Sequence, residues 1–247
     1  MKTNLYIPRE YRVHCENKCF VQFEVVQEQS DLFIIAKTDL YNKAAEVLRQ
    51  LRQEIKSYIA LDERFLTSLS PVKVLKCAPE IIKDMAFAGE RMNVGPMAAV
   101  AGAISEYVAR SLSQFSEQVI VENGGDNFII DREPFTVGIY AGDSPLSMKI
   151  GIEIEPQSDG IAVCTSSGTV GHSLSFGRAD AVTVIAKSGS LADAGATAIC
   201  NMVKTEDDIK KALDYAHNIK KILGLIIIVN DKIGAIGSIV KLKPIAD

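Results

Sequence analysis

Strand-like runs come in neighbouring pairs along this chain, and helical stretches separate one pair from the next. Residues 20–26 and 32–36 are rich in β-branched and aromatic side chains and flank a polar, turn-like segment at 27–31. Residues 118–122 and 127–130 form a second such pair. Adjacent strands joined by short turns build antiparallel sheets, whereas single strands alternating with helices build parallel ones. The pattern therefore predicts an α+β fold in which helices pack against a largely antiparallel sheet.

The helical stretches carry apolar residues at helical spacing. Within residues 39–59 these residues recur every three or four positions, behind an aspartate that can cap the helix. A run of small residues at 98–103 follows Gly95-Pro96, a pair that can open a helix, and this helix is expected to continue to about Leu112. Further helices are expected at 61–69, 79–89, 191–203 and 205–224, and further strands at 135–140, 149–154, 161–165, 181–186, 225–229 and 238–242.

The composition is that of an ordinary globular protein, with 47% hydrophobic and 23% charged residues. No internal period of 20–50 residues is visible, and no low-complexity linker divides the chain. A single unit of 247 residues can bury a large core. Residues 1–247 are therefore expected to form one domain.

Charge and hydropathy exclude two classes of partner. The formal net charge is −4 and the lysines and arginines form no basic block, so nucleic acid is not an expected partner. The first ten residues lack the apolar run of a signal peptide. The longest apolar stretch, 223–229, is too short to span a bilayer and contains Gly224. We expect a cytoplasmic protein that does not enter a membrane.

The five cysteines are expected to be reduced thiols. An odd count in a chain of this kind argues against a disulfide framework. The one cluster, His14, Cys15 and Cys19, has too few ligands and no regular partner pair for a zinc site. Redox or thiol chemistry at Cys15 and Cys19 is the alternative.

The segment Asn123-Gly124-Gly125-Asp126 lies between two predicted strands. Adjacent glycines allow positive φ and let a backbone approach a ligand closely. The same four residues are also a standard signal for a plain hairpin turn. Both interpretations can hold together, because a glycine turn at strand ends can expose amide groups.

A loop of hydroxyls and glycines follows the strand at 161–165. Ser166, Ser167 and Gly168 offer O–H and N–H donors to phosphate oxygens, and His172 can add a charge or a proton. The glycine spacing does not match a phosphate loop or a dinucleotide fingerprint. No nucleophile elbow accompanies Ser167 and His172, which argues against a hydrolase of that class. An ordinary polar loop is the alternative to ligand binding.

Asp193 and Thr197 are four positions apart, so they share one face of a predicted helix. A carboxylate and a hydroxyl together suit a hard cation such as Mg²⁺. Ser190 and Asp193 also fit a capping box, in which Asp193 would serve its own helix. A capping box alone would not require Thr197 or the small residues around it.

Taken in order, these segments resemble the ApbE superfamily. The most specific parallel is an Ala-Asp-x-x-x-Thr-Ala string at 192–198, which follows a strand of the same kind in family members. The other parallels are Gly124-Gly125-Asp126 after a strand and the Ser167-Gly168 loop with His172. The resemblance covers residues 95–203. It implies a short cytoplasmic branch of the superfamily, with ApbE-like, duplicated T-fold-like antiparallel sheets packed with helices.

ApbE proper is a magnesium-dependent transferase that splits FAD and attaches FMN to a threonine of a partner protein. The resemblance implies that Asp193 and Thr197 hold Mg²⁺ with a backbone carbonyl near residues 98–102, and that Asp193 and His172 are catalytic. Ala101-Gly102 stands where the transferases have Lys-Gly. The residues expected along the FAD or FMN are Gly124, Gly125, Asp126, Ser166, Ser167, Gly168, Ala101 and Gly102.

The sequence thus predicts a protein that binds a flavin or another phosphate-bearing nucleotide with Mg²⁺. As an enzyme it would transfer FMN or hydrolyse FAD to FMN and AMP. The alternative is a non-transferase accessory protein of anaerobic sulfur assimilation towards homocysteine, with Cys15, Cys19 or Cys164 as a sulfur carrier. A third reading is an assembly role without a ligand, in which the chain forms a homo-oligomer.

Overall fold

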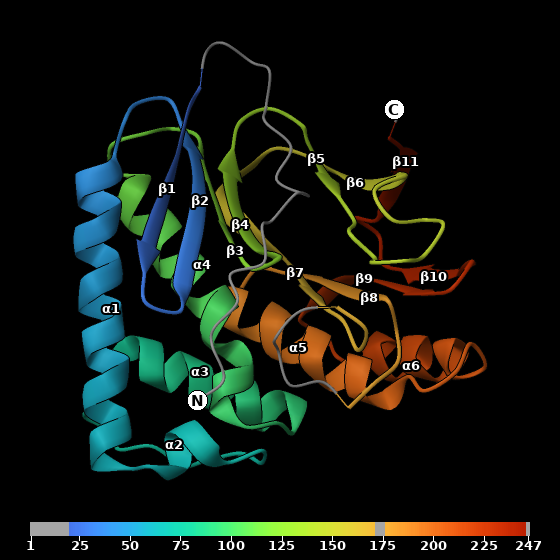
Figure 1. The fold of residues 1–247 in the computed structure, drawn as a ribbon, viewed down its shortest axis with the longest axis horizontal. Helices are drawn as coiled ribbons and strands as arrows, with labels where there is room; N and C mark the ends of the chain where they lie inside the picture. Colours follow the sequence, from blue (N-terminus) through green and yellow to red (C-terminus); the bar gives the residue numbers. More distant parts are fainter. Residues whose placement is uncertain (1–19, 171–175, 246–247) are drawn as a thin grey trace.

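The computed structural model describes residues 20–170 and 176–245. Its centre is an eight-stranded sheet with the strand order β1-β2-β3-β4-β7-β8-β9-β10 (Figure 1). Every neighbouring pair in it is antiparallel, which confirms the predicted α+β class. The strands are β1 (Val21–Gln27), β2 (Ser30–Ala36), β3 (Val119–Asn123), β4 (Asp126–Asp131), β7 (Gln157–Ser166), β8 (Ala181–Ala186), β9 (Ile222–Val229) and β10 (Lys232–Ile236).

The helices pack on one face of this sheet, and α1 stands beside β1 and β2 at the left of Figure 1. A three-stranded sheet packs on the other face, where Ile152 and Ile154 join the side chains of the large sheet in a second core. The helices are α1 (Tyr41–Leu61), α2 (Arg64–Thr67), α3 (Glu80–Met92), the 3₁₀ turn η1 (Pro96–Ala99), α4 (Val100–Leu112), α5 (Gly189–Met202) and α6 (Asp208–His217); the small sheet has β5 (Phe135–Gly138), β6 (Ile150–Ile154) and β11 (Lys241–Pro244).

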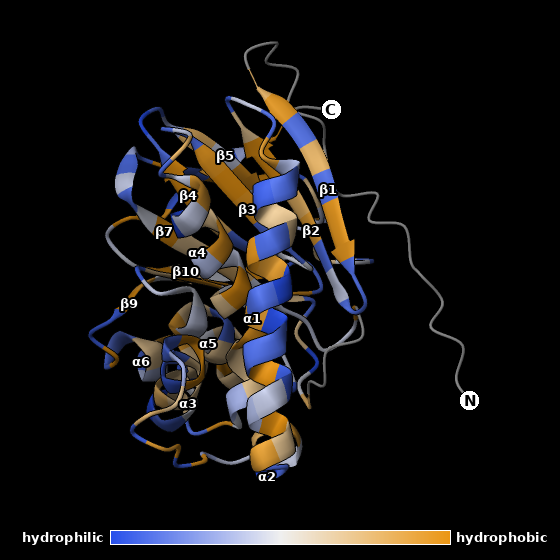
Figure 2. Cartoon of the chain, turned by 90° about the vertical axis from the view of Figure 1, so that its left-hand side faces the viewer, coloured by the Kyte–Doolittle hydropathy of each residue, from blue (hydrophilic) through white to orange (hydrophobic). Residues whose placement is uncertain are grey.

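The inner strands of the large sheet are buried on both faces, whereas the edge strands β1 and β10 are partly exposed. On β2, Ile34 faces the helices while Phe33 and Ile35 face the small sheet, and all three are buried. Strands covered on both sides are apolar throughout instead of alternating between apolar and polar residues. The helices keep a polar outer face, which Figure 2 shows in blue along α1.

The same sequence of elements occurs twice along the chain. A hairpin (β1-β2), a helical segment ending in α4 and a second hairpin (β3-β4) are followed by a hairpin (β7-β8), helices α5 and α6, and a last hairpin (β9-β10). The sheet keeps the two sets side by side, with β4 paired to β7. As a result, α4 of the first set packs directly against α5 of the second.

Three predicted boundaries were wrong. The helix expected from residue 95 opens as a 3₁₀ turn, and α4 begins only at Val100. The helix expected to run to residue 224 ends at His217, because β9 already starts at Ile222. The strand expected at 238–242 begins only at Lys241, as β11, which pairs with β6 in the small sheet. The strand β10, which forms a tight hairpin with β9 and pairs Lys232 with Val229, was not predicted.

No helix in the two described stretches is long and apolar enough to cross a membrane. The three cysteines within them form no disulfide: Cys77 is exposed, and Cys164 and Cys200 are buried. His14, Cys15, Cys19 and His172 lie outside the described residues, so the predictions for them remain predictions.

Candidate functional site at the crossing of α4 and α5

The glycine pair forms a tight hairpin turn between β3 and β4. Gly124 and Gly125 have φ values of 69° and 98°, and Asn123 pairs with Asp126 across the turn. Two positive φ angles in a two-residue loop are typical of the turns that match the strand twist. The Gly125 amide donates a hydrogen bond to Glu122 Oε1 at 2.7 Å. The hairpin interpretation is confirmed, and the turn places Asp126 at the start of β4 on the face that carries the helices.

Asp193 binds the beginning of a helix other than its own. Its Oδ2 atom accepts hydrogen bonds from the amides of Ala101 at 3.0 Å and Gly102 at 2.9 Å. These amides lie in the first turn of α4, where backbone N–H groups have no partner within the helix. The N-cap of α5 is Ser188, whose side chain accepts from Leu191 N. The capping-box interpretation of Ser190 and Asp193 was therefore wrong.

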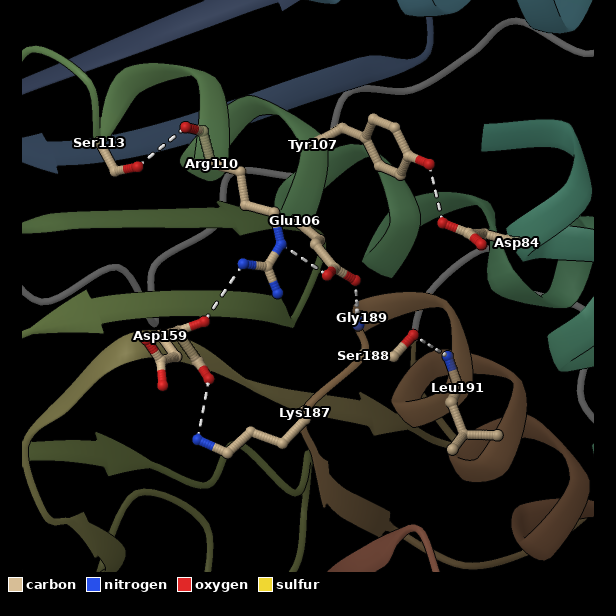
Figure 3. Close-up of polar contacts among 11 residues, drawn as sticks. Asp84, Glu106, Tyr107, Arg110, Ser113, Asp159, Lys187, Ser188, Gly189 and Leu191 are labelled. Carbon is tan, nitrogen blue, oxygen red and sulfur yellow. Dashed lines mark hydrogen bonds and ion pairs between the residues drawn. The ribbon is translucent and has the colours of Figure 1, made fainter. Parts of the chain in front are cut away.

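Glu106 makes the matching contact in the opposite direction. From the second turn of α4, its Oε2 atom accepts a hydrogen bond of 2.6 Å from the amide of Gly189, the first residue of α5 (Figure 3). Each helix thus supplies a carboxylate to the beginning of the other. A Cβ on Gly102 would lie 2.3 Å from Gly189 O and 2.8 Å from the Asp193 Cβ, so the helices cross with their backbones in contact.

Three ionisable groups are buried together beside this crossing. Asp126 is paired in register with Cys164 on the neighbouring strand, and the Cys164 thiol lies 3.8 Å from Gly189 O. Burial raises the pKa of Asp126 well above its usual range, and the charge of Asp193 raises it further. Burial raises the pKa of Asp193 to about 7 against the effect of the Gly102 and Ala101 amides. Two buried carboxyls in such proximity cannot both ionise freely unless a cation compensates them.

Three oxygens around these groups have no hydrogen-bond partner within the described part of the chain. They are Asp126 Oδ1, Ser166 Oγ at the end of β7 and Ser190 Oγ in α5. Ser190 precedes Asp193 by about one helical turn, and Ser166 lies two residues beyond Cys164 on the same strand face. A buried polar atom without a partner costs about 1–3 kcal/mol. The arrangement therefore has donor and acceptor capacity that the described residues do not use.

The Ser167-Gly168 loop is largely satisfied from within. Ser167 Oγ accepts from the amides of Thr169 and Val170, and the Gly168 amide donates to Ala179 O at 2.9 Å. Thr169 Oγ1 donates to Asp180 Oδ1 at 3.0 Å. Of the predicted site residues, the structure gathers Ala101, Gly102, Asp126 and Asp193 at the crossing and holds Ser167 and Gly168 beside the start of β8.

The donor set fits a hard cation such as Mg²⁺ that completes its shell with water and ligand oxygens. Mg²⁺ sites commonly use one or two carboxylates together with substrate phosphates. Asp126 and Asp193 would be those carboxylates, and Thr197, one turn after Asp193 and half-buried, adds a hydroxyl. Within residues 20–170 and 176–245, no group of three or more His, Cys, Asp or Glu side chains is arranged to hold a metal ion. An ion here would therefore need oxygens from water and the ligand as well as from the protein. The carbonyl of Ala101 lies in the segment 98–102 that was expected to supply a backbone ligand to Mg²⁺. Its oxygen already accepts hydrogen bonds from Ser105 Oγ at 2.9 Å and Asn123 Nδ2 at 3.3 Å.

Sequence reasoning missed Glu106. A signal for it existed, because Gly102 precedes Glu106 by four residues and Gly189 precedes Asp193 by the same spacing. In this protein, the glycine and the acidic residue one turn later in α4 and in α5 belong to the two helices that cap each other.

The sheet order and the helix crossing define the class of protein, which is ApbE-like. The flavin transferase ApbE from Vibrio cholerae aligns with a TM-score of 0.57 at 14% sequence identity, over 89% of this chain and 97% of that chain. The ApbE protein from Thermotoga maritima aligns with a TM-score of 0.58 at 14% identity, over 87% of this chain and 96% of that chain. At these identities the likeness establishes the fold.

Sequence similarity supplies the family. The family model described as AbpE bacteria matches residues 12–232, and the chain belongs to that family. A UPF0280 protein from Methanocaldococcus jannaschii is 44% identical over 223 residues, which is 88% of this chain and 91% of that protein. A UPF0280 protein from Methanopyrus kandleri is 46% identical over 199 residues, 78% of this chain and 80% of that protein.

Proposed function

We propose that this protein binds a flavin nucleotide, FAD or FMN, together with Mg²⁺ at the crossing of α4 and α5. The observation that carries the proposal is the burial of Asp126 and Asp193 side by side, with oxygens around them that have no hydrogen-bond partner among residues 20–170 and 176–245. The ApbE-like fold supports flavin as the ligand, because the V. cholerae protein of that fold is a flavin transferase. The assignment of individual residues rests on the chemistry of the donors.

Asp193 and Thr197 would hold the ion, with Asp126 as a second carboxylate. Asp193 Oδ2 is engaged by the α4 amides, which fix the side chain, so Oδ1 is the atom that would contact the ion. The bound ion would neutralise charge on the pyrophosphate of FAD. The hydroxyls of Ser166 and Ser190 can donate to phosphate oxygens, since they have no acceptor within the described residues.

The nucleotide would extend from the crossing along Gly124, Gly125 and the Ser167-Gly168 loop. The backbone of Gly125 could be approached closely by the nucleotide, because the nearest atom to an added Cβ would be Thr165 O at 3.6 Å. Its φ of 98° also disfavours any residue with a side chain. In the hydrolytic version, the oxygen of water bonds to the FMN phosphorus and the bond to the AMP phosphate breaks. In the transfer version, a threonine hydroxyl of a partner protein takes the place of water. His172 is the candidate for accepting the proton of the attacking oxygen.

Calorimetric titration of the protein with FAD, with and without Mg²⁺, tests binding directly. Mass spectrometry of the same mixture would detect AMP and FMN if the pyrophosphate is cleaved. We expect Mg²⁺-dependent binding that Asp193→Ala abolishes. Absence of heat with FAD, FMN and Mg²⁺ in every combination would reject the proposal.

The accessory role in sulfur assimilation is the second candidate, and Ala101 is the observation that favours it. The transferases have a lysine there, and the small side chain of Ala101 supplies no cation to the nucleotide. Cys164 is not a suitable sulfur carrier, because it is fully buried and burial raises the pKa of its thiol well above its usual range. Growth on sulfide of a strain with Cys15→Ser and Cys19→Ser would test the remaining candidates.

A further inference from the structure

Both oxygens of the Glu106 carboxylate are committed. Oε2 accepts from Gly189 N at 2.6 Å, and Oε1 accepts from Arg110 Nε at 2.8 Å on the same helix. The Glu106 side chain is only 12% exposed. A buried carboxylate is stable only when it is paired. The two hydrogen bonds satisfy this need and together hold the Glu106 side chain in one conformation.

Arg110 anchors Glu106 to the sheet. Its guanidinium lies 4.8 Å from the centre of the Phe128 ring on β4 and donates to Asp159 O on β7 at 3.2 Å. Figure 3 shows the chain of contacts from Asp159 through Arg110 and Glu106 to Gly189. The start of α5 is therefore tied, through Glu106, to strands that lie beneath α4.

The place of Asp193 depends on the place of Gly189. Asp193 follows Gly189 by four residues in a rigid helix, and its carboxylate must reach Ala101 N and Gly102 N across the crossing. Gly189 has no side chain of its own to hold the helix. A shift of the α5 start by an ångström would move the Asp193 carboxylate by a similar distance, which is enough to lose a hydrogen bond.

We infer that Glu106 is a positioning residue of the α4–α5 site, which sets the location of the Asp193 carboxylate by holding the first turn of α5. For its effect on ligand binding this inference rests on the proposed function. Residues that orient a metal ligand from behind typically contribute 10–100-fold to metal affinity. Glu106 would act in this way without touching the ion or the nucleotide.

Amide hydrogen exchange of the full-length protein, without ligand, tests the positioning itself. We compare the wild type with Glu106→Gln, which keeps an acceptor oxygen but no charge, and with Glu106→Ala, which has neither. Exchange at Gly189 should accelerate in the order wild type, Gln, Ala, and exchange at Ala101 and Gly102 should follow in parallel, by roughly tenfold or more in the alanine variant. If the alanine variant does not fold, the glutamine variant decides the comparison.

Tyr107→Phe is the matched control. Tyr107 is the next residue on α4 and donates to Asp84 Oδ2 at 2.7 Å, towards α3 and away from α5 (Figure 3). This variant loses an interhelical hydrogen bond of α4, but exchange at Ala101, Gly102 and Gly189 should stay within about twofold of the wild type. Exchange at Ala101 and Gly102 that does not follow Gly189 across the series would overturn the inference.

The second measurement is the Mg²⁺ concentration that supports half-maximal FAD binding. It should rise about 10–100-fold in Glu106→Ala, less in Glu106→Gln and not in Tyr107→Phe. If the wild type binds FAD and these values do not follow the exchange series, the role of Glu106 at the site is overturned while the proposed function stands. If the wild type binds no FAD, the proposed function fails, and the exchange series alone still decides whether Glu106 positions Asp193.

Discussion

Gly102 and Gly189 meet backbone to backbone where α4 crosses α5. A Cβ on Gly102 would lie 2.3 Å from Gly189 O, and a Cβ on Gly189 would lie 2.2 Å from Gly102 O. Such distances exclude any side chain at either position. The close approach is what allows Glu106 to reach the amide of one helix and Asp193 to reach the amides of the other.

Gly102→Ala should destabilise the protein, although alanine favours helices. The added methyl would collide with a backbone carbonyl that cannot move alone, and overpacking of this kind costs about 1–3 kcal/mol. Gly195→Ala in α5 is the control, because its nearest new contact would be an ordinary 3.5 Å from Val184 Cγ1. That variant should gain about 0.5–1 kcal/mol from helix propensity. Urea unfolding measures the free energy of unfolding of both variants. Equal changes in Gly102→Ala and Gly195→Ala would contradict the close packing at Gly102.

Asp193→Asn and Asp193→Ala should separate the structural role of Asp193 from its role at the site. Asparagine retains an oxygen that can accept from Ala101 N and Gly102 N, so its stability should stay near that of the wild type. Alanine loses this interaction and should cost about 0.5–2 kcal/mol, as other capping residues do. Both variants lack the carboxylate and should lose Mg²⁺-dependent FAD binding. Retained binding in the asparagine variant would remove Asp193 from the ion site.

Asp126→Asn should make the protein more stable at pH 8 and change it little at pH 4. Burial raises the pKa of Asp126 in the folded state, so its neutral form favours folding at low pH and this contribution is lost as the pH rises through the folded-state pKa. Asparagine stays neutral, and the expected gain at pH 8 is on the order of 1–3 kcal/mol. Urea unfolding with a chelator present, at both pH values, is the measurement. A gain at pH 4 as large as that at pH 8 would disagree with a buried, titrating Asp126.

Asp62→Asn provides the opposite sign as a control for that experiment. The hydrogen bond from the Arg64 side chain lowers the pKa of Asp62, a half-buried residue at the end of α1. The stability it contributes is present above the unfolded-state pKa and is lost as the pH falls through the folded-state pKa. Asp62→Asn should therefore destabilise the protein slightly at pH 8, whereas Asp126→Asn should stabilise it.

Thr197→Ser and Thr197→Val should differ in Mg²⁺ affinity but hardly in stability. Serine keeps the hydroxyl that would contact the ion, and valine replaces it with a methyl group of similar size. We expect valine to raise the Mg²⁺ requirement of FAD binding by about tenfold or more, and serine to change it little. Removing Mg²⁺ with a chelator should weaken FAD binding to the wild type at least as much. Equal Mg²⁺ requirements in the two variants would exclude Thr197 as a ligand.

Much of this protein could be predicted from local patterns. The hairpin at Gly124-Gly125 could be predicted because adjacent glycines between two strands favour a two-residue turn with positive φ. Asp193 could be predicted as a candidate site residue because helical spacing places it on one helix face with Thr197. The strand expected at 238–242 was predicted about three residues early, since β11 begins at Lys241, and β10 after the hairpin at Asn230 was missed. Strand boundaries depend on the partner strand, which local patterns do not reveal.

The sequence alone determined the antiparallel α+β architecture, since turn chemistry and hydrophobic spacing act between residues close in the chain. Only the tertiary structure decided what the acidic side chains do. Asp193 caps amides 91 and 92 residues away, and Glu106 caps one 83 residues away. Helix capping was visible in the sequence only as a relation within one helix, and no spacing rule specifies which distant amides a carboxylate will meet. That choice follows from the pairing of β4 with β7, which brings α4 and α5 together at their two glycines.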